Sequence, residues 1–164
     1  MHKVIINASP IISLCKIGLE NMIFELFDEI YTTDEVIEEI NKKQGNESVF
    51  LNDAISLNKI KKYTVLKKDL INELYGKMHK GELSVIIGGL ELNIDNVIID
   101  EIAARNFSES LSLSPIGTIG ILRIAKRKGM IVEIKPYLNK LKENGFWLSN
   151  LIMDSILKME NELI

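Results

Sequence analysis

Short apolar runs, each closed by a polar residue, recur along the chain. Residues 4–6 (Val-Ile-Ile) are followed by Asn7, and residues 97–99 (Val-Ile-Ile) are followed by Asp100. Both runs are β-branched and precede sequence with helical spacing, a pattern typical of buried parallel strands. The predicted strands are residues 3–7, 30–31, 60–66, 96–100 and 113–116. Strands that alternate with helices favour an α/β fold with a parallel sheet and helices on both faces.

Start and stop signals place the helices between these strands. Ser9 is expected as the N-cap of the first helix, with Pro10 at its first position and Gly18 after its end. Thr32-x-x-Glu35 has the spacing of a capping box and predicts the start of another helix. Further helices are expected near residues 22–27, 47–56, 68–76, 80–93, 101–110, 117–129, 135–144 and 149–162. Pro115 makes the fifth strand an edge strand, because proline cannot donate to a ladder. Gly88-Gly89 should let the apolar helix 80–93 approach the sheet closely.

Composition narrows the class of protein. The 164 residues fit one ordinary domain over residues 1–164, and an apolar content of 46% suffices for a sizeable core. The formal net charge of −3 excludes a binder of nucleic acid that is basic overall, so a polyanion would have to meet a local basic patch. Cys15 is the single cysteine, which excludes an internal disulfide and is best explained as a small buried apolar residue. We find no signal-peptide pattern and no apolar run of the ~20 residues that span a bilayer, so we expect a soluble, cytoplasmic protein.

Four oxygen-bearing side chains are candidates for a ligand site. Asn7 and Asp100 follow predicted strands, and the carboxyl ends of parallel strands form the rim where ligands bind. Glu39 and Glu82 lie on predicted helices between those strands. If the four meet, they form an oxygen-rich pocket suited to Mg²⁺ or Mn²⁺. Because grouped carboxylates repel one another, such a cluster is hard to explain as structure alone.

Each candidate also has a structural explanation that the sequence leaves open. Asp100 could cap the helix that follows it, and Glu82 could be a first-turn carboxylate favoured by the helix dipole. Asn7 could simply form the turn ahead of Ser9-Pro10. Glu38 and Glu39 are adjacent and point to different faces of a helix, so periodicity does not decide which one faces a pocket.

Six segments, in order, resemble the PIN-domain superfamily, metal-dependent ribonucleases that include many prokaryotic toxins. They are residues 4–12, 36–40, 79–86, 97–105, 117–122 and 144–149. The resemblance implies a three-layer α/β/α domain with a five-stranded parallel sheet and an acidic pocket that binds Mg²⁺ or Mn²⁺. Carried over by position, the metal ligands would be Asn7, Glu39, Glu82 and Asp100, with Glu101 beside them. Glu39, Glu82 and Asp100 would also be catalytic. Ser9 and Thr118 would contact these ligand side chains without binding the metal themselves.

The resemblance implies hydrolysis of RNA, and it extends to partners. The chain could be the toxin of a toxin–antitoxin pair, bound by a small antitoxin protein, and it could form a homodimer. One position departs from the family pattern: the first acidic residue of the family is Asp, and here it is Asn7. An amide offers an oxygen without a charge, which should weaken metal affinity. The alternative function is therefore a catalytically weakened or inactive PIN-like protein that binds nucleic acid or a partner.

The late part of the chain carries basic and aromatic candidates. The basic ones are Arg105, Arg123, Lys126 and Arg127. They could be solvated cations favoured at a helix end or a rim that contacts RNA phosphates, and both interpretations stay open. Phe146 and Trp147 are expected in the core or at an interface rather than as a base-stacking surface. The helices in residues 135–163 should pack on the domain or at an interface.

Overall fold

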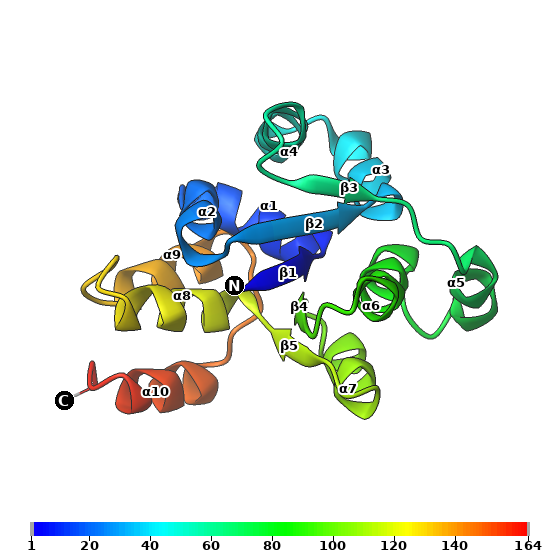
Figure 1. Cartoon of the computed structure of the whole chain (residues 1–164). Coiled ribbons are helices and arrows are strands. Elements are labelled where there is room, and N and C mark those ends of the chain that lie inside the picture. Colours follow the sequence, from blue (N-terminus) through cyan, green and yellow to red (C-terminus); the bar gives the residue numbers. More distant parts are fainter. Residues whose placement is uncertain (1, 164) are drawn as a thin grey trace.

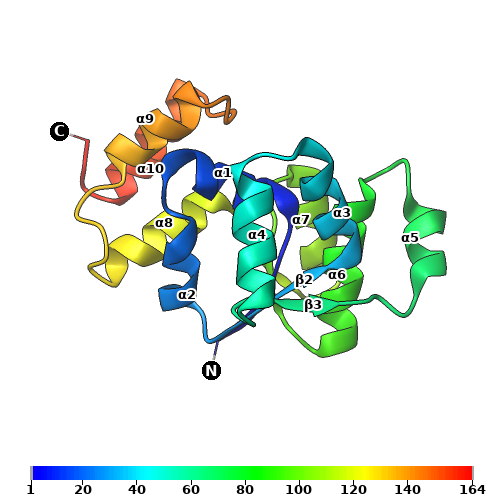
Figure 2. The same ribbon diagram turned by 90° about the horizontal axis from the view of Figure 1, so that it is seen from above.

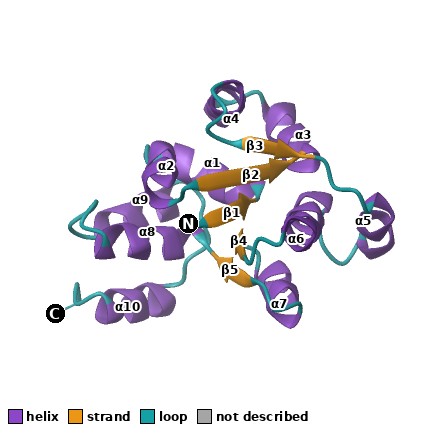
Figure 3. Cartoon of the chain, in the orientation of Figure 1, coloured by secondary structure: helices purple, strands orange, loops and turns teal. Residues whose placement is uncertain are grey.

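The strands form one parallel sheet in the order β3-β2-β1-β4-β5. In the computed structural model, which describes residues 2–163, all four strand pairings are parallel (Figure 3). The strands are β1 (Lys3–Ile6), β2 (Glu29–Thr33), β3 (Lys61–Tyr63), β4 (Asn96–Ile98) and β5 (Ser114–Ile116). The predicted five-stranded parallel sheet is confirmed.

Helices cover both faces of this sheet. In Figures 1 and 2, α1, α8 and α9 lie on one side of the strands, and α5, α6 and α7 lie on the other. The helical elements are α1 (Ala8–Ile17), η1 (Glu20–Met22), α2 (Ile23–Leu26), α3 (Asp34–Lys43), α4 (Asn46–Ser56), α5 (Lys68–Leu74), α6 (Lys80–Leu92), α7 (Ile102–Ser110), α8 (Thr118–Arg127), α9 (Lys135–Glu143) and α10 (Asn150–Met159). The architecture is therefore the three-layer α/β/α arrangement expected from the sequence.

The core is centred on β1 and β4, whose apolar runs are buried on both faces. Val4, Ile5 and Ile6 have no exposed surface, and neither have Val97 and Ile98. Such continuous β-branched runs are what a parallel strand covered by helices on both sides requires. β5 lies at the edge of the sheet, as its proline predicted.

The order of the strands creates a switch point between β1 and β4. The chain passes from β1 to β2 and β3 on one side, and then returns to the other side of β1 as β4 and β5. The amide of Asn7 donates a hydrogen bond to the Ile98 carbonyl oxygen at 3.0 Å, so the ends of these two strands are adjacent. Open α/β sheets bind ligands in the crevice at such a point.

Two predicted helix starts are wrong by one or two residues. The N-cap of α1 is Asn7 rather than Ser9, and Pro10 is its third residue. Proline is tolerated there because the first-turn amide groups have no partner within a helix. Thr33 rather than Thr32 caps α3, and its hydroxyl accepts from the Val36 amide at 3.4 Å. The Thr32 hydroxyl instead donates to the Ile6 carbonyl oxygen at 2.9 Å, which ties β2 to the end of β1.

The close approach predicted for the glycine pair in α6 is confirmed. A Cβ built on Gly88 would lie 2.9 Å from Ile5 Cδ1, so a larger residue would push the helix away from β1. In the described part of the chain, no helix has the length and apolarity needed to cross a bilayer. Cys15 is half-buried rather than fully buried, and its pKa is raised to about 12 by burial and by the negative charges of Glu20 and Glu47.

Candidate active site

A pocket of about 640 Å³ opens at the carboxyl ends of β1 and β4. Its lining includes six of the residues singled out in the sequence, namely Asn7, Ser9, Glu39, Glu82, Asp100 and Glu101. These residues come from the start of α1, from α3, from the first turn of α6 and from the segment after β4. The switch point therefore brings together side chains that are separated by up to 94 positions in the chain.

The side chains of Asn7 and Glu39 both approach the first turn of α6, where Gly81 leaves space for them. A Cβ on Gly81 would lie 2.8 Å from Glu39 Oε2 and 3.2 Å from Asn7 Oδ1. Asn7 is only 3% exposed, and its Oδ1 has no hydrogen-bond partner within residues 2–163. A buried carbonyl oxygen without a partner is costly unless a ligand satisfies it. Turn formation does not explain this side chain, because it makes no capping hydrogen bond to α1.

The structure decides between the two adjacent glutamates of α3. Glu39 lines the pocket, whereas Glu38 is exposed and does not. The helix rotates by about 100° per residue, so only one of two neighbours can face the sheet. The choice of Glu39, made from the family pattern, agrees with this placement.

Glu82 is almost fully buried at the start of α6, with 7% of its surface exposed. Its Oε2 accepts a hydrogen bond from the backbone amide of His79 at 3.0 Å, so it does stabilise the helix start. Burial raises the pKa of the Glu82 carboxyl, and the negative charges of Glu101 and Glu39 add to the rise. The capping role and a role in the pocket are thus compatible for this residue.

The side chain of Asp100 is fixed by Thr118, the first residue of α8, which follows β5. The Thr118 amide donates to Asp100 Oδ1 at 2.6 Å, and the Thr118 hydroxyl donates to Oδ2 at 2.7 Å. Asp100 does not cap α7, whose N-cap is Glu101. Burial raises the pKa of the Asp100 carboxyl, although the bonds from Thr118 and the positive charge of Arg105 act in the opposite direction.

The chemistry of these donors suits a hard divalent cation. Carboxylate and amide oxygens are the usual ligands of Mg²⁺, which binds through one or two carboxylates and keeps several waters. Among residues 2–163, no three His, Cys, Asp or Glu side chains gather closely enough to hold an ion by themselves. Asn7 Oδ1, which has no partner, and Glu39 Oε2 nevertheless both lie within 3.2 Å of one point, the position of a Cβ on Gly81, so the residues fit an ion that retains part of its water shell.

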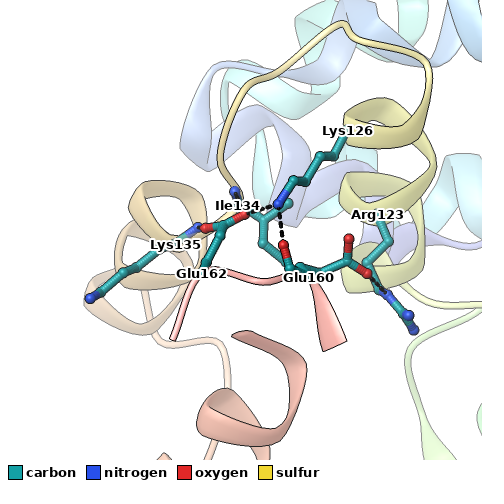
Figure 4. A network of polar contacts seen from close by, with 6 residues as sticks. All are labelled: Arg123, Lys126, Ile134, Lys135, Glu160 and Glu162. Carbon is teal, nitrogen blue, oxygen red and sulfur yellow. Dashed lines mark hydrogen bonds and ion pairs between the residues drawn. The ribbon is translucent and has the colours of Figure 1, made fainter. Parts of the chain in front are cut away.

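The four basic candidates have different surroundings. Arg123 Nε donates to Glu160 Oε1, and Lys126 Nζ donates to Glu162 Oε1 at 2.7 Å and to the Glu160 carbonyl oxygen at 2.6 Å (Figure 4). These two cations hold the end of the chain against α8. Arg105 and Arg127 have no ion pair with a carboxylate in the described residues.

The structure adds residues to the pocket that sequence reasoning did not assign to it. Ser13, Lys16, His79 and the segment that joins α9 to α10 all contribute to its lining. Lys16 Nζ donates to the Asn144 carbonyl oxygen at 3.2 Å and links α1 to that segment. Trp147 is 74% exposed on the pocket rim, so of its two expected places the core is wrong, and an interface stays a prediction. The only sequence signal for this segment was its part in the family pattern.

Comparison with known proteins identifies the family. Residues 3–162 match a family described as the PIN domain. No curated protein and no solved structure matches the chain. The match spans nearly the whole chain and agrees with the five-stranded parallel sheet. The chain therefore belongs to the PIN-domain family.

Proposed function

We propose that this protein is a Mg²⁺- or Mn²⁺-dependent ribonuclease that hydrolyses phosphodiester bonds of RNA. PIN domains are in general dependent on divalent metals, and family membership supports a nuclease-like fold. The observation that carries the proposal is the buried, unpartnered Oδ1 of Asn7 beside Glu39, in a pocket that Glu82 and Asp100 also line. A purely structural pocket has no need for this arrangement.

In this proposal, Glu39, Glu82 and Asp100 would hold the ion in part through the waters that it keeps, and Asn7 would add a neutral oxygen. When bound, the ion would lower the pKa of a water and offset the negative charge that develops on the phosphate. Without a cation the carboxylates would repel an RNA phosphate, and a bound ion would offset part of that negative charge. Thr118 keeps both oxygens of Asp100 in one orientation, as the supporting groups of a metal site do.

A cleavage assay tests this function. End-labelled single-stranded and hairpin RNAs are incubated with wild type, Asp100→Asn and Glu82→Gln, in Mn²⁺ or in EDTA. We expect Mn²⁺-dependent products from wild type and a loss of at least about tenfold in each variant. Glu38→Gln is the matched control, because Glu38 is the exposed neighbour of Glu39, and it should cleave normally. Unchanged cleavage by Asp100→Asn and Glu82→Gln would contradict the proposal.

A second function is favoured by Asn7 itself. Because this position supplies no negative charge, metal affinity and water activation are weakened, and the protein could retain RNA or a partner without cutting. The same assay separates the two functions, because this alternative gives RNA retention with no product.

The toxin role, the small antitoxin protein and the homodimer stay predictions of the resemblance. Light scattering of the purified chain, alone and co-expressed with the product of the neighbouring gene, tests them together. A single protomer in both preparations would contradict the homodimer and the antitoxin complex.

A further inference from the structure

Trp147 is held in a fixed place while its ring is left in solvent. The backbone before it is fixed by a hydrogen bond from the Phe146 amide to the Leu141 carbonyl oxygen at 2.9 Å. After it, Leu148 is 7% exposed, and the Ser149 hydroxyl accepts from the Ile152 amide at 3.2 Å to begin α10. Trp147 is nevertheless 74% exposed. A single exposed apolar residue is ordinary, so its significance depends on what surrounds it.

Trp147 lies between two adjoining cavities. The charged side chains that line one are mainly carboxylates, and those that line the other are mainly arginines. Trp147 lines the acidic pocket, and it also lines a second cavity of about 510 Å³. Three further residues, Asp100, Ile102 and Phe146, line both, so the two cavities share one wall. The charged lining of the second cavity, apart from Asp100, consists of Arg105, Arg123 and Arg127.

Two of those arginines are positioned to meet an anion. Arg123 is paired with Glu160, whereas Arg105 and Arg127 make no ion pair with a carboxylate of residues 2–163. A Cβ on Gly117 would lie 3.2 Å from Asp100 Oδ1 and 3.5 Å from Arg105 Nη1. The guanidinium of Arg105 is therefore next to the acidic pocket, on the side of the second cavity.

We propose that Trp147 is a base-stacking residue for single-stranded RNA, with Arg105 and Arg127 contacting the phosphates of nucleotides that lie beyond the acidic pocket. This inference rests on the proposed function, since it supplies the path of the substrate at the same site. Exposed aromatic rings beside a positively charged groove are how proteins bind unpaired strands. The base faces of a duplex are covered by stacking, so the ring selects single strands over helices.

The protein offers a direct spectroscopic test, because Trp147 is its only tryptophan. A single-stranded oligoribonucleotide is titrated into wild type in EDTA, and separately in Mn²⁺ at a temperature where no product forms. We expect quenching of the tryptophan fluorescence on binding. A duplex of the same length, and a strand with abasic riboses, should quench much less.

Anisotropy of a labelled strand then compares the variants. Trp147→Ala should bind about tenfold more weakly, and Trp147→Phe, which keeps an aromatic face, should bind within about threefold of wild type. Arg105→Gln should reduce the slope of log affinity against log salt by about one. Val132→Ala is the control, since Val132 is 88% exposed and lines neither cavity, and it should bind as wild type does.

Several outcomes would overturn the inference. These are an absence of strand binding by wild type, equal affinity of Trp147→Ala, equal affinity for the abasic strand, or a fluorescence change that follows protein concentration without RNA. The last would mean that a second copy of the chain covers Trp147. If wild type cleaves RNA but Trp147→Ala binds normally, the proposed function stands and the stacking role fails. If binding needs Trp147 but no product forms, the stacking role stands and the ribonuclease fails.

Discussion

Thr118 holds both carboxylate oxygens of Asp100, one through its backbone amide at 2.6 Å and the other through its hydroxyl at 2.7 Å. The residue that begins α8 thereby fixes a side chain that follows β4. The same carboxylate lines the acidic pocket. The contact with Thr118 therefore ties α8 to the end of β4 and also orients a proposed metal ligand.

Removing the Thr118 hydroxyl should lower stability and loosen Asp100. Thr118→Val keeps the shape and the amide bond, but leaves Asp100 Oδ2 without its donor. We expect the free energy of unfolding to fall by about 1–2 kcal/mol, measured by urea denaturation. Thr118→Ser restores a hydroxyl and should recover most of the loss. A full loss in Thr118→Ser as well would mean that packing of the methyl group, rather than the hydrogen bond, is responsible.

A methyl group at position 81 should weaken metal binding while leaving the stability of the protein nearly unchanged. In Gly81→Ala the new Cβ would lie 2.8 Å from Glu39 Oε2, so the flexible end of that carboxylate must move away. The new Cβ would also lie 3.2 Å from the buried Asn7 Oδ1. The gain of up to about 1 kcal/mol that alanine brings to a helix should offset the cost of these shifts, so the variant should be about as stable as wild type. Its Mn²⁺ affinity, measured by calorimetry, should fall. Unchanged affinity would mean that Glu39 Oε2 does not contact the ion.

The contacts of Glu29 should make the free energy of unfolding depend on pH in the acid range. The hydrogen bond from Lys61 Nζ at 2.9 Å, that from the Tyr31 hydroxyl at 2.8 Å and the ammonium of Lys3 lower the pKa of Glu29 from 4.5 to about 2. Because the pKa is lower in the folded state, the stabilisation is complete above pH 4.5 and is lost as the pH falls through about 2.

The comparison is between wild type and Glu29→Gln in urea at a series of pH values. The difference in free energy of unfolding should be largest near neutral pH and should shrink between pH 4.5 and 2. Glu25→Gln, an exposed position on α2, should show no such trend. A difference between wild type and Glu29→Gln that does not change with pH would contradict the assignment.

Glu162, which follows α10, should hold the start of α9 against α8. Its Oε1 accepts from Lys126 Nζ and from the Ile134 amide, both at 2.7 Å, and its Oε2 accepts from the Lys135 amide at 2.8 Å (Figure 4). These amides are the unpaired donors at the start of α9. Glu162→Gln should lower the free energy of unfolding by about 1–2 kcal/mol, whereas Glu143→Gln at the exposed end of α9 should change it little. Equal effects of the two variants would show that α9 does not depend on this carboxylate.

The sheet and most of the pocket could be predicted because their signals are local. The apolar runs before Asn7 and Asp100 identify the two central strands, and the polar residues that close them fall at the ligand-binding edge. Deciding between Glu38 and Glu39 needed the family pattern, since spacing alone favours neither.

The errors arose where a long-range contact overrides a local preference. Thr32 has the spacing of a cap but is used between strands, where its hydroxyl reaches the Ile6 carbonyl oxygen. Arg123 and Glu160 are 37 positions apart, and no pattern in the sequence announces their pairing. Trp147 is exposed whereas Leu148 beside it is buried, and only the packed structure decides which of the two apolar side chains enters the core.

Asn7 determines how strongly the pocket should bind metal. Asn7→Asp would add the negative charge that the family pattern has at this position, where the wild-type side chain lies near Glu39 and the residue is only 3% exposed. Without metal the added charge should destabilise the protein, because it is buried among like charges. With Mn²⁺ the variant should bind more tightly than wild type, since carboxylate is a stronger ligand than amide.

The most direct test of a metal-dependent site is a calorimetric Mn²⁺ titration of wild type, Asn7→Asp and Asp100→Asn. The account predicts binding by wild type, tighter binding by Asn7→Asp, and a loss of at least about tenfold in affinity for Asp100→Asn. Equal binding by wild type and Asp100→Asn, or no binding by either wild type or Asn7→Asp at millimolar Mn²⁺, would contradict it.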